Sequence, residues 1–503
     1  MFRAVRSIAR FTTIARTLAR YDALFPLEGL GVSPLLLGIL KFGTRKDKTA
    51  RPGRRLALAL EKLGPTFIKL GQMLSTRPDL VGEAVAADLS ALQDHIPPFP
   101  YAEAREIVED ELGGPLEHFF SAFEEAPHAA ASIAQVHFAT TTSGNPVAVK
   151  VRRPDVEAAF ARDLDLFYWA AEWVERVRPH FRRLKPREVV ATFAEQVSVE
   201  MDFRLEAAAA TELGENFAAD PTFRVPRIDW ERTGRRVLTS ERIYGIPIDE
   251  CEQLIAAGHD PNVILANAAK VFFAQVFRDG FFHADQHPGN AFVDKDGVIV
   301  AIDFGIMGRL DRQTRAFLAD MMIGFLRRDY RLVAEVHFRA GFVPAHKSID
   351  AFTQALRAIA EPIMDKPLHE ISIAKLLGLL FQTTETFEME TQPQLLLLQK
   401  TMLVTEGVGR SLNPDVNMWT MARPMIEEWM RAFRGPEARL IETARSIGET
   451  LNNIPTILAN AQKALAKLAE ADFEQSRRIY VRIWPVWISI AALAVAVLVL
   501  AAR

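Results

Sequence analysis

The distribution of apolar and polar residues changes several times along this 503-residue chain. The stretch from Leu56 to about Leu112 is rich in Ala and Leu and is interrupted by prolines, which predicts a series of helices. Residues 132–138 and 146–151 then form two strand candidates around a Thr-Ser-Gly-Asn turn. From Asp155 to Glu215 the pattern is again helical. A short β-containing stretch is therefore expected between two helical ones.

Two further strand candidates precede a long helical region. Residues 237–243 are strand-like, and the β-branched run Val298–Ile302 predicts a buried strand. From Gly305 to Glu470 we expect helices and no further strands. The layout is a small β-containing unit followed by a mostly helical unit.

The first residues of the chain predict a basic amphipathic helix. Its arginines occupy about one half of a helical wheel, and its apolar residues gather on the other: Arg3, Arg6, Arg10, Arg16 and Arg20 against Ile8, Phe11, Ile14, Ala15 and Leu18. Such a helix is expected to lie on an anionic membrane. A mitochondrial transit peptide and a helix packed on the protein body are the alternatives. Residues 42–55 are polar and are expected to form a connector.

The opposite end of the chain predicts a membrane anchor. Residues 483–502 form an uncharged apolar run of the length needed to cross a bilayer. Trp484 and Trp487 stand at its start, and arginines precede it, so the body of the protein is expected on the cytoplasmic side. A buried core helix is the alternative.

Composition narrows the class of protein. The length predicts two to four folding units, and 49% apolar with 24% charged residues is typical of a globular chain. A formal net charge of −3 excludes a strongly basic nucleic-acid binder. The single cysteine, Cys251, excludes internal disulfides and cysteine-based zinc or iron–sulfur sites, and indicates a reducing compartment.

The segment from His283 to Asn290, followed by Asp303-Phe-Gly, carries the most specific chemistry. An Asp, an Asn five residues later and a second Asp after a buried strand suit phosphoryl transfer from a nucleoside triphosphate. One carboxylate orients the acceptor, and the amide and the second carboxylate hold Mg²⁺. A metal site made by His283, Asp285 and His287 is one alternative. The other is a turn that is rich in His and Asp by chance and has no function.

A second set of residues complements this segment. Lys150 ends an alternating strand, where a lysine can reach nucleotide phosphates if a carboxylate from a nearby helix holds it. Asp202 and Glu206 lie four residues apart on one helix face and repel each other unless a cation is near. Pairing of one of them with Lys150 would explain the acidic cluster better than a solvated acidic face does.

These residues, together with three motifs, resemble the UbiB family of atypical protein-kinase-like proteins that serve ubiquinone biosynthesis. Residues 69–72 (Lys-Leu-Gly-Gln) match its Lys-x-Gly-Gln signature, and residues 200–202 (Glu-Met-Asp) match its Glu-x-Asp signature. Residues 129–132 (Ala-Ala-Ala-Ser) match the alanine-rich loop that replaces a glycine-rich loop. The resemblance covers about residues 55–470. It implies an α+β, atypical two-lobed protein-kinase-like fold, to which we add an N-terminal helical extension and a C-terminal transmembrane helix.

The resemblance also implies roles for individual residues. Lys150 would contact the phosphates and be held by Glu206, Asp285 would be the catalytic base, and Asn290 and Asp303 would bind Mg²⁺ beside ATP or ADP. Ser240 would precede the hinge. The expected nucleotide contacts are Ala129, Ala130, Ala131, Ser132, Ile133, Ala134, Gln135, Val136, Ala148, Lys150, Glu241 and Ile243. The helix with Lys69, Gly71 and Gln72 would fold over the site and interact with Glu200 and Asp202.

Several features disfavour phosphorylation of other proteins. The alanine-rich loop lacks the glycines that let a backbone wrap tightly over phosphates, and no Ala-Pro-Glu sequence follows Asp303. An insertion at about Val156 to Glu188 is expected to form a helical pair that builds an apolar wall over the site. Its apolar residues, which would suit an isoprenoid substrate, are Phe160, Leu164, Phe167, Trp169 and Trp173.

The expected domains are residues 1–55, a basic segment and connector; 56–126, the helical extension; 127–243, the N-lobe with its insertion; 244–470, the helical C-lobe; and 471–503, the anchor.

The expected function is that of a membrane-anchored kinase-like ATPase or phosphotransferase that handles polyprenylphenol precursors of ubiquinone. A non-catalytic lipid-binding scaffold and a 2-polyprenylphenol hydroxylase component are the alternatives. Expected partners are membrane lipid and prenylated phenols, with other ubiquinone-biosynthesis proteins and a homodimer left open. The expected location is the bacterial inner membrane, rather than the mitochondrial one.

Overall fold

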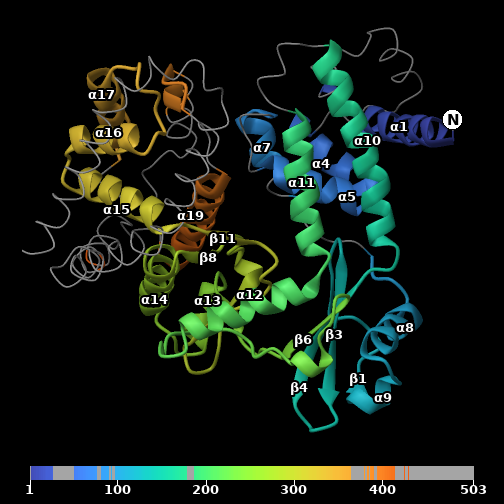
Figure 1. Ribbon diagram of the computed structural model, residues 1–503. Coiled ribbons are helices and arrows are strands. Elements are labelled where there is room, and N and C mark those ends of the chain that lie inside the picture. Colours follow the sequence, from blue (N-terminus) through green and yellow to red (C-terminus); the bar gives the residue numbers. More distant parts are fainter. Residues whose placement is uncertain are drawn as a thin grey trace, which may run out of the picture. The chain divides into compact units, whose positions relative to one another are not determined.

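Figure 1 shows the computed structural model of the chain. It describes residues 2–25, 50–75, 81–89, 97–177, 186–363 and 393–413, with isolated positions at 92, 379, 382–384, 386–389, 424 and 429. The chain divides into two compact units, Met1–Glu427 and Glu428–Arg503, and the elements below belong to the first. No helix within the described ranges is both long and apolar enough to cross a bilayer. The predicted anchor, residues 483–502, lies outside the described residues.

In the described residues of the N-terminal part, the helices are α1 (Phe2–Arg20), α4 (Pro52–Leu63), α5 (Pro65–Ser75) and α7 (Glu83–Leu89). Their apolar side chains share one core, in which Ile14 and Leu18 of α1 pack with Leu56 and Leu60 of α4. The predicted amphipathic helix is therefore present, but its apolar face from Ile14 onward is already covered by protein. Of the interpretations weighed, the helix packed on the body holds for this part of α1.

Prolines mark the boundaries of these helices, as predicted from the sequence. Pro65 begins α5 directly after Gly64, whose φ of +104° turns the chain between α4 and α5. Pro52 begins α4, so the predicted connector ends before residue 55. The rest of that connector, residues 26–49, lies outside the described part of the chain.

The first sheet carries the lysine strand. It consists of β1 (Phe120–Phe123), β2 (Ala129–Ala130), β3 (Ala134–Thr141), β4 (Pro146–Arg152) and β6 (Val237–Glu241), all antiparallel, with the order β1-β3-β4-β6. In β4, Val147, Val149 and Val151 point to one face and are buried against α8 (Tyr101–Leu112). Because side chains alternate along a strand, Lys150 points to the opposite face. The short helix α9 (Leu116–Phe119) leads into β1.

A helical pair is present, α10 (Val156–Val177) and α11 (Pro186–Glu200), but most of α11 lies beyond the predicted end of the insertion at Glu188, and α12 (Phe203–Asn216) follows it. Figure 1 shows α10 and α11 beside α4 and α5. Both α10 and α11 contact α5. Phe160 is buried, and the ring of Phe167 packs edge-on against Phe67 of α5. Leu164 and Phe167 are partly buried, and the tryptophans are the more exposed members, with Trp169 at 51% and Trp173 at 37% exposed. Most of the predicted apolar wall is thus interior packing.

The remaining elements form a largely helical region with two small sheets. One sheet has the order β5-β10-β9-β7, and β8 pairs with β11 in the other. The strands are β5 (Phe223–Arg224), β7 (Ile246–Pro247), β8 (Phe281–His283), β9 (Ala291–Val293), β10 (Ile299–Ala301) and β11 (Met307–Arg309). The helices are α13 (Cys251–Ala256), α14 (Pro261–Phe273), α15 (Arg312–Leu326), α16 (Tyr330–Arg339), α17 (Ile349–Ala360) and α19 (Pro393–Leu412).

Strand β11 corrects the expectation that no strand follows Gly305. Its three residues are too few to show an alternating pattern, and Gly308 in its centre weakens a strand prediction. The glycine is needed for packing, since a Cβ atom there would lie 2.1 Å from the ring of Phe282 in the paired strand β8.

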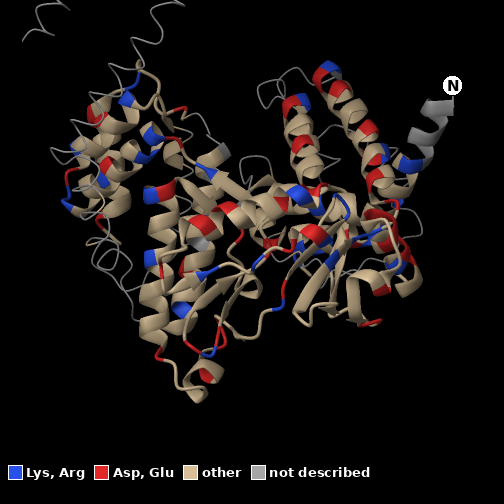
Figure 2. Cartoon of the chain, turned by 60° about the horizontal axis from the view of Figure 1, so that its bottom comes forward, with Lys and Arg blue, Asp and Glu red and all other residues tan. Residues whose placement is uncertain are grey.

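Basic and acidic residues are interspersed along the described helices and loops (Figure 2), in keeping with the small net charge.

Candidate active site

Lys150 lies at the centre of a cluster of charged side chains. Its Nζ atom donates to both carboxylate oxygens of Glu206, at 2.8 and 3.0 Å, and to Oδ1 of Asp303 at 3.2 Å. Glu206 stands in the first turn of α12, which Asp202 caps by accepting a hydrogen bond from the backbone of Arg204. The predicted lysine–glutamate pair is therefore formed, and the lysine bridges it to the Asp of the Asp-Phe-Gly segment.

The cluster shifts the pKa values of its members. Burial lowers the pKa of Lys150, but the carboxylates of Asp303 and Glu206 outweigh burial and raise it. The Lys150 ammonium holds the pKa of Asp303 well below its usual range, and Lys69 acts in the same direction. Burial raises the pKa of Glu206, and the attraction of Lys150 offsets this only in part. At neutral pH, Lys150 and Asp303 are therefore charged, as phosphate and metal binding require.

The loop that carries Asp285 is held by its own backbone contacts. The Nδ1 atom of buried His283 accepts from the backbone N–H of Asp285 at 3.1 Å, so Nε2 carries the proton and donates to the carbonyl of Ile302 at 3.2 Å. The side chain of Asn290 donates to the carbonyl of Asp285 at 3.0 Å, and Nδ1 of His287 accepts from Gly289.

These contacts argue against the alternative interpretation of the same segment, a metal site. Both ring nitrogens of His283 are occupied by backbone groups, so this residue cannot ligate a metal in the observed arrangement. Within the described ranges, no three His, Cys, Asp or Glu side chains are grouped to hold a metal ion. The His283, Asp285 and His287 metal site is therefore wrong as a prediction.

Paired strands bring the two expected Mg²⁺ ligands together. Ala291 of β9 lies opposite Ala301 of β10, and the backbone N–H of Ile302 donates to the carbonyl of Asn290 at 2.8 Å. Asn290 and Asp303 thus flank neighbouring ends of an antiparallel pair, and the φ of +61° at Asp303 turns its side chain out of the strand direction. An amide oxygen and a carboxylate are hard oxygen donors of the type that Mg²⁺ takes together with phosphate oxygens. The residues fit the ion.

Helix α5 covers the cluster from the side of the helical extension. Lys69 Nζ contacts Glu200 Oε2 at 2.8 Å, and both side chains are mostly buried. Asp202 instead pairs with Arg204, so only one acid of the Glu-x-Asp motif meets Lys69. Gly71 permits close packing of α5, since a Cβ atom there would lie 2.4 Å from Leu92 and 2.8 Å from Leu60. Gln72 lies half-buried on the same helix.

The alanine-rich segment is a tight hairpin between β2 and β3. Ala129 pairs with Val136 and Ala130 with Gln135, and the N–H of Ala131 donates to the carbonyl of Ala134 at 2.8 Å. The side chain of Gln135 is fully buried and bonds to the backbone of Phe99 and to His137, so it does not face a nucleotide.

One buried polar atom in the hairpin lacks a partner. Among the described residues, the Oγ atom of Ser132 is buried and accepts or donates no hydrogen bond. An unpaired buried hydroxyl is costly. Ile133 is also buried here.

The connector between β6 and the helical region follows a strand that pairs with the lysine strand, and its contact with adenine stays a prediction. Ser240 pairs with Ala148 of the lysine strand, and Ile243 follows just beyond β6. The N–H of Glu241 already donates to the carbonyl of Arg227 at 2.8 Å, and its carboxylate contacts Arg224. Any contact from Glu241 to a nucleotide would therefore come from its carbonyl.

Sequence reasoning missed one charged residue of this site. Lys400 of α19 donates to Oδ1 of Asp285 at 2.7 Å, across 115 residues of sequence. Thr405, one turn further along α19, donates to Gln286 at 3.2 Å. A lone lysine between Gln399 and Thr401 on an apolar-rich helix was the available signal, but nothing in the sequence pairs it with residue 285.

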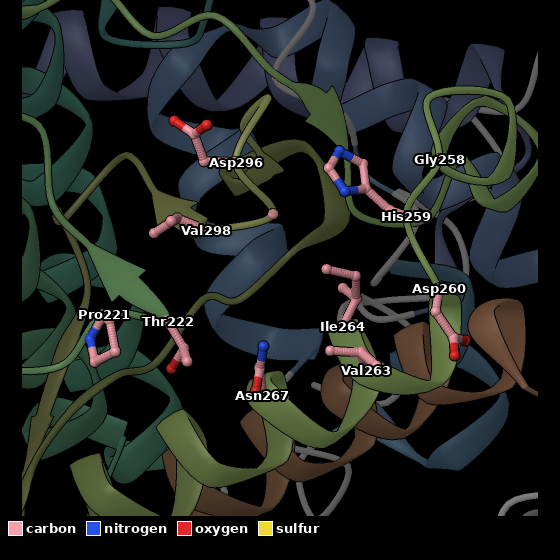
Figure 3. Close-up of a pocket in the computed structure, with 11 residues that line it drawn as sticks. Pro221, Thr222, Gly258, His259, Asp260, Val263, Ile264, Asn267, Asp296 and Val298 are labelled. Carbon is pink, nitrogen blue, oxygen red and sulfur yellow. The ribbon is translucent and has the colours of Figure 1, made fainter.

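A separate pocket of about 290 Å³ lies on the helical region (Figure 3). Its walls come from the start of α14, the turn between β9 and β10, and the chain before β5, with Asn267, His259, Asp296 and Thr222 among the lining residues. None of the charged residues of the Lys150 cluster lines it. We do not assign the predicted chemistry to this pocket.

The chain is similar to known proteins over almost its whole length. Residues 91–337 match the ABC1 atypical kinase-like domain, and residues 356–417 match the UbiB helical domain. It is 43% identical over 470 residues to a probable protein kinase UbiB of Marinobacter nauticus, covering 92% of this chain and 86% of that protein. The probable protein kinase UbiB of Azotobacter vinelandii is 42% identical, covering 94% of this chain and 89% of that protein.

A solved structure agrees with this assignment. A Mycobacterium tuberculosis protein, determined in complex with erythromycin, superposes with a TM-score of 0.52 at 25% identity and covers 71% of this chain and 90% of its own. The family motifs, the lysine–glutamate–aspartate cluster and the full-length similarity coincide. The chain therefore belongs to the UbiB family of atypical kinase-like proteins.

Proposed function

We propose that this protein binds Mg·ATP and hydrolyses it, or transfers its terminal phosphoryl group to a small acceptor, in support of ubiquinone biosynthesis. The observation that carries the proposal is the contact of Lys150 with both Glu206 and Asp303. A lysine fixed between a helix glutamate and the Asp of an Asp-Phe-Gly segment is the arrangement with which kinases hold phosphates.

Each residue of the cluster has a distinct task. Glu206 fixes the direction of Lys150, whose ammonium group binds phosphate oxygens. Asn290 and Asp303 would hold Mg²⁺, which neutralises charge on the transferred phosphoryl group when it is bound. Asp285 orients the attacking hydroxyl or water. Its own position is fixed by backbone contacts with His283 and Asn290.

The cover over the site favours a small acceptor over a protein. The Lys69–Glu200 contact ties α5 to the end of α11 beside the cluster, where a polypeptide substrate would need room. The chain also passes from β11 into α15 without an intervening extended segment on which a peptide could dock. Both features support handling of a phenolic lipid precursor in place of protein phosphorylation.

The proposal places the protein at the cytoplasmic face of a bacterial inner membrane. The uncharged run at 483–502 would anchor it there, and the similar proteins named above are bacterial. Exposed Trp169 and Trp173 on α10 are side chains of the type that settle at a membrane interface. Polyprenylated phenols of the ubiquinone pathway would reach the site from the bilayer.

The test is a nucleotide-turnover assay on the purified full-length protein in anionic vesicles, with and without a polyprenylphenol. We expect Mg²⁺-dependent ATP hydrolysis that rises with the lipid and is abolished by Asp303→Asn. Asp296→Asn, the same change on an exposed turn, is the matched control and should keep wild-type turnover. Undiminished turnover in Asp303→Asn would contradict the proposal. Removal of residues 483–503 should release the protein from the vesicles in a flotation assay.

A further inference from the structure

Helix α19 brings a third lysine to the active site. Lys400 Nζ lies 2.7 Å from Oδ1 of Asp285, and both side chains retain contact with solvent. Lys150 and Lys69 pair with other carboxylates, those of Glu206, Asp303 and Glu200. Lys400 is thus the lysine that pairs with Asp285, the residue proposed to orient the acceptor.

The position of Lys400 is fixed by the packing of its helix. One stripe of α19 is buried, comprising Leu398, Thr401, Thr405, Val408 and Leu412. Val408 and Leu412 belong to the same apolar cluster as Phe281 and Phe304, which flank the catalytic loop. The contact of Thr405 with Gln286 adds a polar link between α19 and that loop.

The chemistry of phosphoryl transfer gives this placement a meaning. The terminal phosphate of ATP must lie next to the acceptor that Asp285 orients, because the acceptor oxygen attacks that phosphorus in line. A cation within hydrogen-bond distance of Asp285 is therefore adjacent to the terminal phosphate oxygens. A triphosphate that enters the site adds negative charge there, which a fixed ammonium group stabilises.

We propose that Lys400 binds the terminal phosphate of ATP and holds Asp285 in its catalytic orientation, so that the helical domain supplies part of the discrimination between ATP and ADP. The inference rests on the proposed nucleotide function and extends it to a residue outside the kinase-like domain.

The experiment measures the binding of two nucleotides rather than turnover. Dissociation constants for Mg·AMP-PNP and Mg·ADP are determined by calorimetry on the full-length protein in detergent. We expect Lys400→Met to weaken AMP-PNP binding about 10- to 100-fold, the usual worth of a hydrogen bond to a charged group, with ADP binding changed less than about twofold. Lys400→Arg keeps the charge and should restore most of the AMP-PNP affinity.

Two variants serve as controls. Lys270→Met removes a lysine that contacts Asp220 elsewhere on the same region, and it should change neither affinity. Thr405→Val breaks the link of α19 to Gln286 while leaving the cation, and it should preserve the ratio of the two affinities. If Lys400→Met does not fold, the wild-type protein still decides the matter. After reductive ¹³C-methylation, the Lys400 resonance should move with Mg·AMP-PNP and stay in place with Mg·ADP.

The possible results separate the two proposals. Equal losses of affinity for both nucleotides, or no loss for either, would overturn the assignment of Lys400 and leave nucleotide binding intact. Failure of the wild-type protein to bind either nucleotide would overturn the proposed function, and this inference with it.

Discussion

Lys69 of α5 and Glu200 at the end of α11 form an ion pair beside the Lys150 cluster, with 2.8 Å between Nζ and Oε2. The two residues belong to different signature motifs and approach each other only in the folded chain. Because Lys69 also lowers the pKa of Asp303, the pair acts on the electrostatics of the cluster as well as on the packing of α5 against α11.

Breaking this pair should open the site. In Glu200→Gln, Lys69 loses its carboxylate partner and α5 is held less firmly, so a fluorescent ATP analogue should associate about tenfold faster in stopped-flow measurements, as expected for the loss of about 1.4 kcal/mol. Asp202→Asn is the matched control, because Asp202 contacts Arg204 and caps α12. Because asparagine caps a helix about as well as aspartate, this variant should keep both the stability and the association rate of the wild type. Equal rates for all three proteins would show that α5 does not gate entry.

The Lys150 cluster predicts a specific loss of stability in alkali. The pKa of Lys150 is raised in the folded protein, so its contribution is fully present below the unfolded-state value of about 10.4 and is lost as pH rises above it. Lys150→Met should cost about 3 kcal/mol at neutral pH, because Glu206 is left buried without its cation. In urea titrations, the difference in the free energy of unfolding between wild type and Lys150→Met should decrease above about pH 10.4.

An arginine at residue 150 provides the control for this measurement. Its guanidinium stays protonated over the whole range, so Lys150→Arg should show no alkaline loss from this site. If the difference in the free energy of unfolding between wild type and Lys150→Met stays constant from neutral to alkaline pH, the raised pKa of Lys150 is contradicted. The acid limb is less informative, because the lowered pKa of Asp303 and the raised pKa of Glu206 have opposite effects on stability there.

The N-terminal helix should be locked to the body by one ion pair. Asp163 of α10 is only 2% exposed and receives two hydrogen bonds from Arg10, at 2.8 and 2.9 Å. Arg10→Met leaves this carboxylate without its main partner, so α1 should lose about 3 kcal/mol of local stability. Hydrogen exchange of α1 amides should rise by about two orders of magnitude. Arg16→Met, at an exposed position of the same helix, should leave exchange unchanged.

Two glycine substitutions should act in opposite directions. Gly71→Ala places a methyl group against Leu92 and Leu60, so it should cost about 1–3 kcal/mol through overpacking. Gly407→Ala adds a methyl group to an exposed face of α19 with no atom within 4 Å, and should stabilise the helix by about 0.5–1 kcal/mol. Thermal unfolding of both variants checks the pair. A stable Gly71→Ala protein would show that α5 packs less closely than the structure indicates.

The sequence predicted the parts of the site that lie in local patterns. The alternating strand before Lys150, the acidic helix with Glu206 and the buried strand before Asp303 each have a periodicity or a motif, and the structure brings them together as expected. Helix α10 also follows from the length and composition of the insertion, whereas most of α11 lies beyond the predicted end at Glu188.

What the sequence could not supply were partners chosen by tertiary packing. Nothing local distinguishes Glu200 from Asp202 as the partner of Lys69, because the choice depends on Arg204 occupying Asp202. Strand β11 was not predicted, because its pairing with β8 depends on the close approach of Gly308 to Phe282. The apolar face of α1 looked suited to a bilayer because its protein partners lie far along the chain.

The contact of Lys400 with Asp285 joins two segments that separate sequence families describe, residues 91–337 and 356–417. A fragment cut between them would uncover the apolar cluster around Phe281 and Phe304 and remove the cation from the catalytic loop. The division between the two matched segments is therefore not a boundary between independently packed cores. The kinase-like segment on its own would leave apolar side chains exposed that α19 covers in the whole chain.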